Sequence, residues 1–150
     1  MKLNYDKTAA WNALLLVIRI WLGYRMIMAS YSSVWDILFN AKERAFFIKW
    51  FGTDLHYPMP LLMAFLAKGA ELSGGIFLCF GLFTKVAASL VAFTMFMATI
   101  TANLGADFNI DGGFTISYCL FACIFIMWGG GKYSLDRLFR LKSAVMPIVI

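Results

Sequence analysis

Four charged side chains stand inside long apolar stretches of this sequence, where a charge needs a physical explanation. Arg19 and Arg25 interrupt the first stretch, and Lys68 and Glu71 interrupt the second. A charge at the middle of a bilayer costs at least about 2.5–3.5 kcal/mol and usually faces a partner or a cavity. These four residues are therefore the first candidates for chemistry in the chain.

The depth of two of these residues predicts an ion pair. If the two stretches form helices that enter the membrane near Ala9 and Leu61, Arg19 and Glu71 each lie about ten residues, or ~15 Å, from the entry point. Because the two helices run in opposite directions, both residues would reach the same level at mid-membrane. We therefore expect Arg19 and Glu71 to pair there.

Three buried bases against one acid leave Arg25 and Lys68 without a structural partner, although Lys68 shares a helix face with Glu71. Two interpretations stay open. In the first, the Arg19–Glu71 pair is structural and the other two bases extend to the membrane surface. In the second, the surplus positive charge favours an anionic or electron-rich group, such as a quinone headgroup, its reduced form or a lipid phosphate. Tyr24 is near enough to line such a site.

The sequence lacks the motifs by which the chain could catalyse a reaction alone. The single histidine, His56, has no second ligand at a useful spacing, so we expect neither a metal site nor haem. The three cysteines lie in apolar stretches without a Cys-x-x-Cys motif, which favours packing roles. The Gly-Gly-Gly-Lys sequence at 129–132 follows an apolar stretch and lacks the preceding strand of a phosphate-binding loop. We therefore expect no covalent cofactor.

Composition decides which kind of element must position these residues. Of the 150 residues, 62% are apolar and 14% are charged, against roughly 45–50% and about a quarter in soluble domains. A soluble fold of this size leaves about a third of its surface exposed and needs polar cover. The composition therefore excludes a soluble enzyme and a nucleic-acid-binding protein, and it indicates an integral protein of the lipid bilayer.

Four segments are long and apolar enough to cross a membrane, which takes about 20 residues. They leave no room for a second domain. We therefore expect a single-domain, all-α, polytopic membrane four-helix bundle. The predicted spans are about 8–34, 60–83, 86–104 and 112–129.

The long connection between the first two spans predicts a short helix of its own. Asn40 with Glu43 three residues later is a helix-start signal, and Gly52 is a plausible end. We expect an interfacial helix with one aromatic side in lipid. The alternative is a lid over an opening between the spans. The aromatic side consists of Phe46, Phe47, Trp50 and Phe51.

The distribution of basic residues predicts the orientation of the chain. Seven bases would lie on one side of the membrane and three on the other, and the basic side of such proteins is cytoplasmic. We therefore expect both termini in the cytoplasm. The first group is Lys2, Lys7, Lys85, Lys132, Arg137, Arg140 and Lys142; the second is Lys42, Arg44 and Lys49, accompanied by Asp54, Asp107 and Asp111.

Three stretches of the sequence resemble the DoxX family of small membrane proteins. The strongest is Trp128–Leu138, which reads Trp-Gly-Gly-Gly-Lys-Tyr-Ser-Leu-Asp-Arg-Leu and resembles the family's glycine-rich closing motif. Glu71–Lys85 is similar to the second span, and Ile18–Gly23 to the first. The resemblance implies two functions, because some DoxX-like proteins are membrane subunits of a thiosulfate:quinone oxidoreductase and others associate with thiol-redox enzymes.

The resulting hypothesis is a membrane subunit of a redox-associated complex in the bacterial inner membrane. It would interact with quinone, contain no redox centre, and act at most as part of a quinone-linked oxidoreductase with partner subunits. The alternative is a non-catalytic scaffold or anchor, and a homo-oligomer fits either function. The residues assigned to the quinone or anion site are Arg19, Tyr24, Arg25, Lys68 and Glu71.

Overall fold

The computed structural model describes residues 2–103 and 110–139, and these residues form helices and short connections without a strand. The predicted all-α fold is therefore confirmed. A last helical turn covers 135–139. The elements are α1 (Lys2–Phe39), α2 (Ala41–Lys49), the π-helix η1 (Trp50–Asp54), α3 (Pro60–Phe80), α4 (Thr84–Ala98), the π-helix η2 (Thr99–Asn103) and α5 (Ile110–Trp128).

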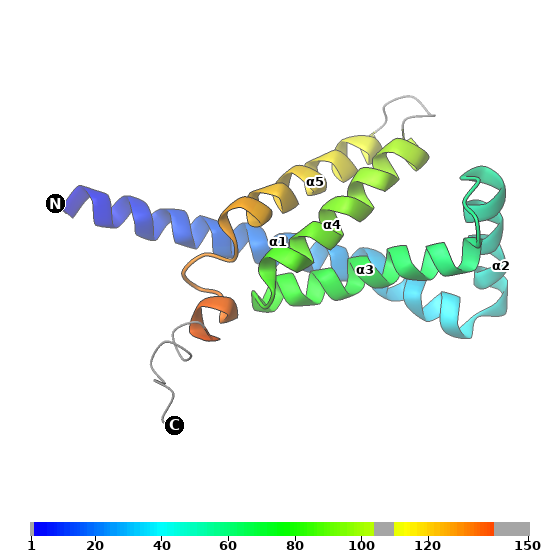
Figure 1. Cartoon of the computed structure of the whole chain (residues 1–150), viewed down its shortest axis with the longest axis horizontal. Coiled ribbons are helices and arrows are strands. Elements are labelled where there is room, and N and C mark those ends of the chain that lie inside the picture. The colour runs from blue at the N-terminus through cyan, green and yellow to red at the C-terminus, as the bar shows by residue number, and fades with distance from the viewer. Residues whose placement is uncertain (1, 104–109, 140–150) are drawn as a thin grey trace, which may run out of the picture.

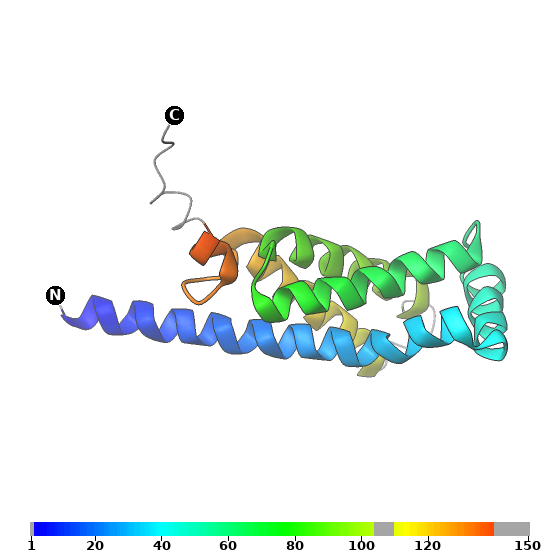
Figure 2. The ribbon, with the colours of Figure 1, turned by 90° about the horizontal axis from the view of Figure 1, so that it is seen from below.

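The four long helices form an elongated bundle with two distinct ends. Helix α1 packs mainly on α3, and α4 packs on both α3 and α5. Figure 2 shows α1 and α3 side by side along the length of the bundle. The N-terminus and the turn at 135–139 lie at one end, here called the N-terminal end, and α2 with η1 covers the opposite end, here called the α2 end (Figure 1).

Proline and glycine set several helix boundaries. Helix α3 begins at Pro60, whose fixed φ suits the first helical position and whose missing N–H is not needed there. It ends at Gly81, which adopts a φ of 68°, the left-handed conformation that commonly terminates helices. Because only three residues separate α3 from α4, the two helices are antiparallel neighbours.

Helices α1 and α3 approach to backbone contact through a pair of glycines. A Cβ atom on Gly75 would lie 2.8 Å from the Gly23 carbonyl oxygen, and one on Gly23 would lie 2.7 Å from the Gly75 carbonyl oxygen. Small residues permit this close packing of membrane helices. The contact aligns α1 against α3, and this alignment decides where the buried charges lie.

The outer faces of the bundle are apolar along the helices. Three helical segments are long and apolar enough to cross a bilayer, Thr8–Phe39, Pro60–Phe80 and Thr84–Thr101, and the apolar part of α5, Gly113–Trp128, is shorter. Large side chains such as Val17 and Phe96 remain exposed on these faces. Because soluble proteins rarely expose continuous apolar surface, these faces contact lipid and the chain is a membrane protein.

The fourth crossing and the orientation remain predictions. Among the residues used for the orientation, Asp107, Arg140 and Lys142 lie outside the described residues. The predicted third span also extends one residue beyond the described part of the chain, to residue 104.

The predicted helix after the first span is present but is longer than expected. The side chain of Asn40 accepts a hydrogen bond from the Lys42 backbone N–H and caps α2, so the predicted start is confirmed. The predicted end at Gly52 is wrong, because the helix continues as η1 through Asp54. Helical hydrogen bonds continue on both sides of Gly52, such as the bond from the Leu55 N–H to the Trp50 carbonyl, so the glycine does not end the helix.

The aromatic side of this segment does not lie wholly in lipid. Phe47 and Phe51 are buried against Ile37 of α1 and Ala64 of α3, whereas Phe46 is exposed. The expected lipid-facing position is therefore wrong for Phe47 and Phe51. The reason is that α2 and η1 fold back over the ends of α1 and α3 and close a small core of their own.

Candidate functional site

The buried guanidinium of Arg19 lies at the N-terminal end of the bundle and bonds to backbone. Its Nη1 donates to the Gly130 carbonyl, and its Nη2 donates to the Tyr133 carbonyl at 2.9 Å. The side chain is only 2% exposed, and no carboxylate forms a salt bridge with it among the described residues. Arg19 therefore joins α1 to the segment that follows α5.

The predicted pairing of Arg19 with Glu71 is wrong. The glycine contact between α1 and α3 places Arg19 beside Gly81, where a Cβ atom would lie 2.7 Å from the guanidinium carbon. Glu71 instead faces Ser30, which is eleven residues, or about 16 Å along the helix, from Arg19. Arg19 therefore lies level with the end of α3, ten residues beyond Glu71, so the two residues are not at the same depth as the assumed entry points near Ala9 and Leu61 implied.

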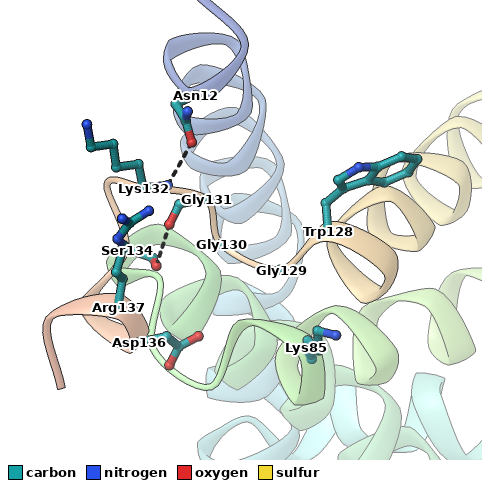
Figure 3. A pocket seen from close by; sticks show the side chains of 10 residues that line it. All are labelled: Asn12, Lys85, Trp128, Gly129, Gly130, Gly131, Lys132, Ser134, Asp136 and Arg137. Atoms are coloured by element: carbon teal, nitrogen blue, oxygen red, sulfur yellow. Dashed lines mark hydrogen bonds between the residues drawn. The ribbon is translucent and has the colours of Figure 1, made fainter. Parts of the chain in front are cut away.

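The segment after α5 is attached to the bundle at several further points. Both carboxylate oxygens of Asp136 accept hydrogen bonds, from the Phe83 N–H at 2.6 Å and the Thr84 N–H at 2.8 Å. The carboxylate thus satisfies two backbone donors at the start of α4. The Lys132 N–H donates to the Asn12 side-chain oxygen at 2.9 Å (Figure 3). The closing motif therefore connects α1, α4 and α5.

Glu71 is at the centre of a second polar group, nearer the α2 end. Its Oε2 accepts a hydrogen bond from Ser30 Oγ at 2.6 Å and forms a salt bridge with Lys68 Nζ at 2.9 Å. The side chains of Lys68 and Glu71 are 20% and 5% exposed. Lys68 therefore has a structural partner, contrary to our expectation.

The other carboxylate oxygen of Glu71 is not used by the fold. Oε1 makes no hydrogen bond with a described residue, and it is not one of the fully enclosed, unpartnered side-chain atoms, which among the described residues are Arg19 Nε and Thr84 Oγ1. Oε1 therefore keeps accessible surface and capacity to accept hydrogen bonds.

Lys68 and Glu71 line an apolar cavity of about 410 Å³ between α3 and α4. Trp50 and Phe51 of η1 contribute to its wall, as does Thr101 of η2, so both π-helical segments border it. Such segments frequently occur at functional sites. The remaining lining residues are Leu55, Tyr57, Met63, Leu66, Ala67, Ala70, Leu90, Phe93, Thr94, Met97 and Ala98.

Arg19, Tyr24 and Arg25, also assigned to the site from the sequence, do not line this cavity. The Nε of Arg25 donates to the Tyr118 hydroxyl on α5 at 3.1 Å, so Arg25 also has a partner that we did not expect. Tyr24 is 53% exposed on the outer face. The structure thus brings together Lys68 and Glu71 only.

The cavity walls include residues that sequence reasoning did not assign to a site. Trp50 and Phe51, which the sequence suggested as part of a lipid anchor or of a lid, both line the cavity. Thr94 could not be recognised as a cavity residue from the sequence, because a threonine in an apolar stretch is typical of any membrane helix. Within the described residues, no three His, Cys, Asp or Glu side chains could share a metal ion.

The fold and the site define a small helical membrane protein with a buried ion pair beside an apolar cavity. The sequence profile of the DoxX family matches residues 14–104, and the chain belongs to this family. The match includes α1 from residue 14 through α4, whereas the closing motif at 128–138 lies outside it. No curated protein and no solved structure matches the chain significantly.

Proposed function

We propose that this DoxX-family protein is the membrane subunit of a redox-associated complex and binds quinone in the cavity beside Lys68 and Glu71. The observation that carries the proposal is the cavity itself, which has apolar walls and one polar pair. Small-molecule sites typically combine apolar walls with a few placed polar groups. A quinone has the matching chemistry, with a polar headgroup and an apolar tail.

The polar pair offers both a donor and an acceptor to a headgroup. An ammonium group has three N–H donors, and Lys68 uses one of them on Glu71. A quinone carbonyl could accept a hydrogen bond from Lys68. The hydroxyl of the reduced form could also donate to the open Oε1 of Glu71. The pair is therefore suited to both redox forms.

The aromatic residues of η1 supply the rest of the proposed site. Trp50 and Phe51 line the cavity from the α2 end, and aromatic rings pack favourably against a flat, conjugated headgroup. In this proposal α2 and η1 form the lid that the sequence suggested as an alternative. The redox centre that exchanges electrons with the quinone belongs to partner subunits.

The proposed setting is the bacterial inner membrane, with both termini in the cytoplasm. Two observations support this orientation. Basic residues are concentrated in the segments assigned to the cytoplasmic side, and the N-terminus lies at the same end of the bundle as the turn at 135–139 (Figure 1). A reporter fused after Ile150 should be active only if it functions in the cytoplasm.

The test is a titration of the purified protein in mild detergent with a short-chain ubiquinone. Tryptophan fluorescence should be quenched, and Trp50→Phe should reduce the quenching because Trp50 lines the cavity. Ala98→Phe should block binding by filling the cavity. Val86→Phe is the matched control on the same helix, because Val86 is 60% exposed and is not part of the wall.

The scaffold function predicts a different result. A scaffold would show no saturable quenching, and Ala98→Phe would behave like Val86→Phe. Partner subunits would still co-purify with both variants after extraction of the native complex in mild detergent. That combination of results would replace quinone binding with an anchoring function.

A further inference from the structure

A second pocket lies at the N-terminal end of the bundle, around the glycine loop at 129–131 (Figure 3). Its volume is about 540 Å³. Figure 3 shows that its walls come from α1, from the start of α4 and from the segment that follows α5. The lining residues are Asn12, Lys85, Trp128, Gly129, Gly130, Gly131, Lys132, Ser134, Asp136 and Arg137.

The side chains around this pocket carry excess positive charge. Lys85, Lys132 and Arg137 line it together with one acid, Asp136. Both carboxylate oxygens of Asp136 already accept backbone N–H groups at the start of α4. None of the three bases forms a salt bridge with a carboxylate in the described part of the chain. Their charge is therefore available to a ligand.

The glycine loop adds backbone donors to the same wall. Gly129 and Gly131 have φ angles of 73° and 74°, a left-handed conformation that glycine adopts without strain. The Gly129 N–H is bonded to the Phe125 carbonyl, whereas the N–H groups of Gly130 and Gly131 make no hydrogen bond with a described residue. Backbone donors in buried positions are nearly always paired, and turns with successive unpaired N–H groups are known anion sites.

The residues around the loop indicate that the pocket is pre-formed and lies where the bundle meets the headgroup layer. Trp128 is 57% exposed and lines the pocket, and tryptophan is enriched where a membrane helix meets the headgroup layer. The loop itself is fixed, because Arg19 holds the Gly130 carbonyl and Ser134 Oγ donates to the Gly131 carbonyl. A pre-formed loop with cationic neighbours is suited to a compact oxyanion.

We infer that this pocket binds a phosphate group through Lys85, Arg137 and the N–H groups of the glycine loop. The group is either the phosphate of an anionic phospholipid headgroup or a free phosphate. The Gly-Gly-Gly-Lys sequence lacks the strand that precedes a nucleotide-binding loop. In this protein the loop is held in position by contacts with α1 and α4 instead. This inference is independent of quinone binding at the other end of the bundle.

The test uses the double variant Lys85→Gln/Arg137→Gln, because neither side chain makes a hydrogen bond within the described residues. The control is Lys42→Gln/Lys49→Gln, which removes the same charge from α2. Each protein is reconstituted in phosphatidylcholine nanodiscs with or without phosphatidylglycerol, and native mass spectrometry measures the phosphatidylglycerol retained. The loss of a charge-assisted hydrogen bond should weaken retention about tenfold or more, while the control should match the wild type.

A second arm distinguishes the two sources of phosphate. Inorganic phosphate is titrated into wild-type protein in pure phosphatidylcholine nanodiscs, and the midpoint of thermal unfolding is followed, with chloride at the same ionic strength as reference. Specific retention of phosphatidylglycerol identifies a lipid site, and a phosphate-specific rise in the midpoint identifies a site for free phosphate. If wild-type protein shows neither effect, or if the control loses retention as strongly as the double variant, the inference is wrong. The charge-conserving Lys85→Arg/Arg137→Lys variant should retain binding, and the titration of wild-type protein decides the question if the double variant does not fold.

Discussion

Two regions of the bundle each hold a charge that interrupts an apolar stretch, and the hydrogen bonding of the two charges differs. At the N-terminal end, Arg19 donates to two backbone carbonyls, and its remaining Nε, which has no partner among the described residues, is fully enclosed and out of reach of a ligand. Nearer the α2 end, Glu71 uses one oxygen and leaves the other open beside a cavity. A buried charge whose hydrogen bonds are supplied by backbone has a structural role. A buried charge that can accept a further hydrogen bond from within a cavity is the better candidate for a ligand contact.

The largest effect should come from removing Arg19. Arg19→Leu leaves the carbonyls of Gly130 and Tyr133 without their donors, and hydrogen bonds to charged groups contribute about 1.5–3 kcal/mol each. We expect a stability loss of about 3 kcal/mol or more, measured as the thermal midpoint in detergent. Arg19→Lys should recover only part of it, because an ammonium cannot replace a planar fork of donors. A stable Arg19→Leu protein that fails to bind quinone would contradict this assignment, because Arg19 would then contact the ligand rather than stabilise the fold.

A smaller loss should follow from disturbing the alignment of α1 and α3. Gly75→Ala brings a Cβ atom to within 2.8 Å of the Gly23 carbonyl oxygen, and such overpacking costs about 1–3 kcal/mol. Gly69→Ala, on the same helix, meets no atom within 4 Å and should be neutral or stabilising by about 0.5–1 kcal/mol. Equal thermal midpoints for the two variants would mean that the glycine contact does not hold the helices in register.

The helical fold could be predicted because it depends on local composition. Apolar stretches of bilayer length and the Asn40 cap are visible in the sequence, and both correspond to helices in the structure. The partners of the charges could not be predicted, because they depend on how one helix is shifted along another. That shift follows from the contact between Gly23 and Gly75, which no spacing within either helix reveals.

The cavity could not be predicted from the sequence, although its two charged residues could. Lys68 and Glu71 were identified as candidate site residues because they are charges in an apolar stretch. Part of the wall around them is formed by η1, which folds back across α3, an arrangement that the amphipathic pattern of 40–52 did not determine. The aromatic pattern alone could not distinguish a lipid anchor from a lid.

A double-mutant cycle should show an intermediate effect at the open charge. Lys68→Met and Glu71→Gln should be coupled by about 1 kcal/mol, because their side chains are in direct contact. Arg19→Lys and Glu71→Gln should be additive within about 0.3–0.5 kcal/mol, as expected for distant sites. Thermal midpoints of the single and double variants provide the energies. Strong coupling of Arg19 with Glu71 would restore the pair that the sequence predicted.

The smallest effect should come from Arg25. Arg25→Gln removes one hydrogen bond to the Tyr118 hydroxyl, and because Arg25 is exposed, this bond should contribute only about 0.5 kcal/mol, the low end for a hydrogen bond. Tyr118→Phe should cost a similar amount, and the double variant should cost no more than either single variant. A much larger loss for Arg25→Gln would show that this arginine has a second role in the fold.

The most direct test of the account compares the quinone affinities of Lys68→Gln and Arg25→Gln in folded protein. Both substitutions remove a positive charge from within the membrane, but only Lys68 lines the cavity. We predict that Lys68→Gln weakens short-chain ubiquinone binding about tenfold, the effect of one charge-assisted hydrogen bond, and that Arg25→Gln leaves the Kd unchanged. A weakened Kd in Arg25→Gln together with a wild-type Kd in Lys68→Gln would contradict the assignment of the cavity as the site.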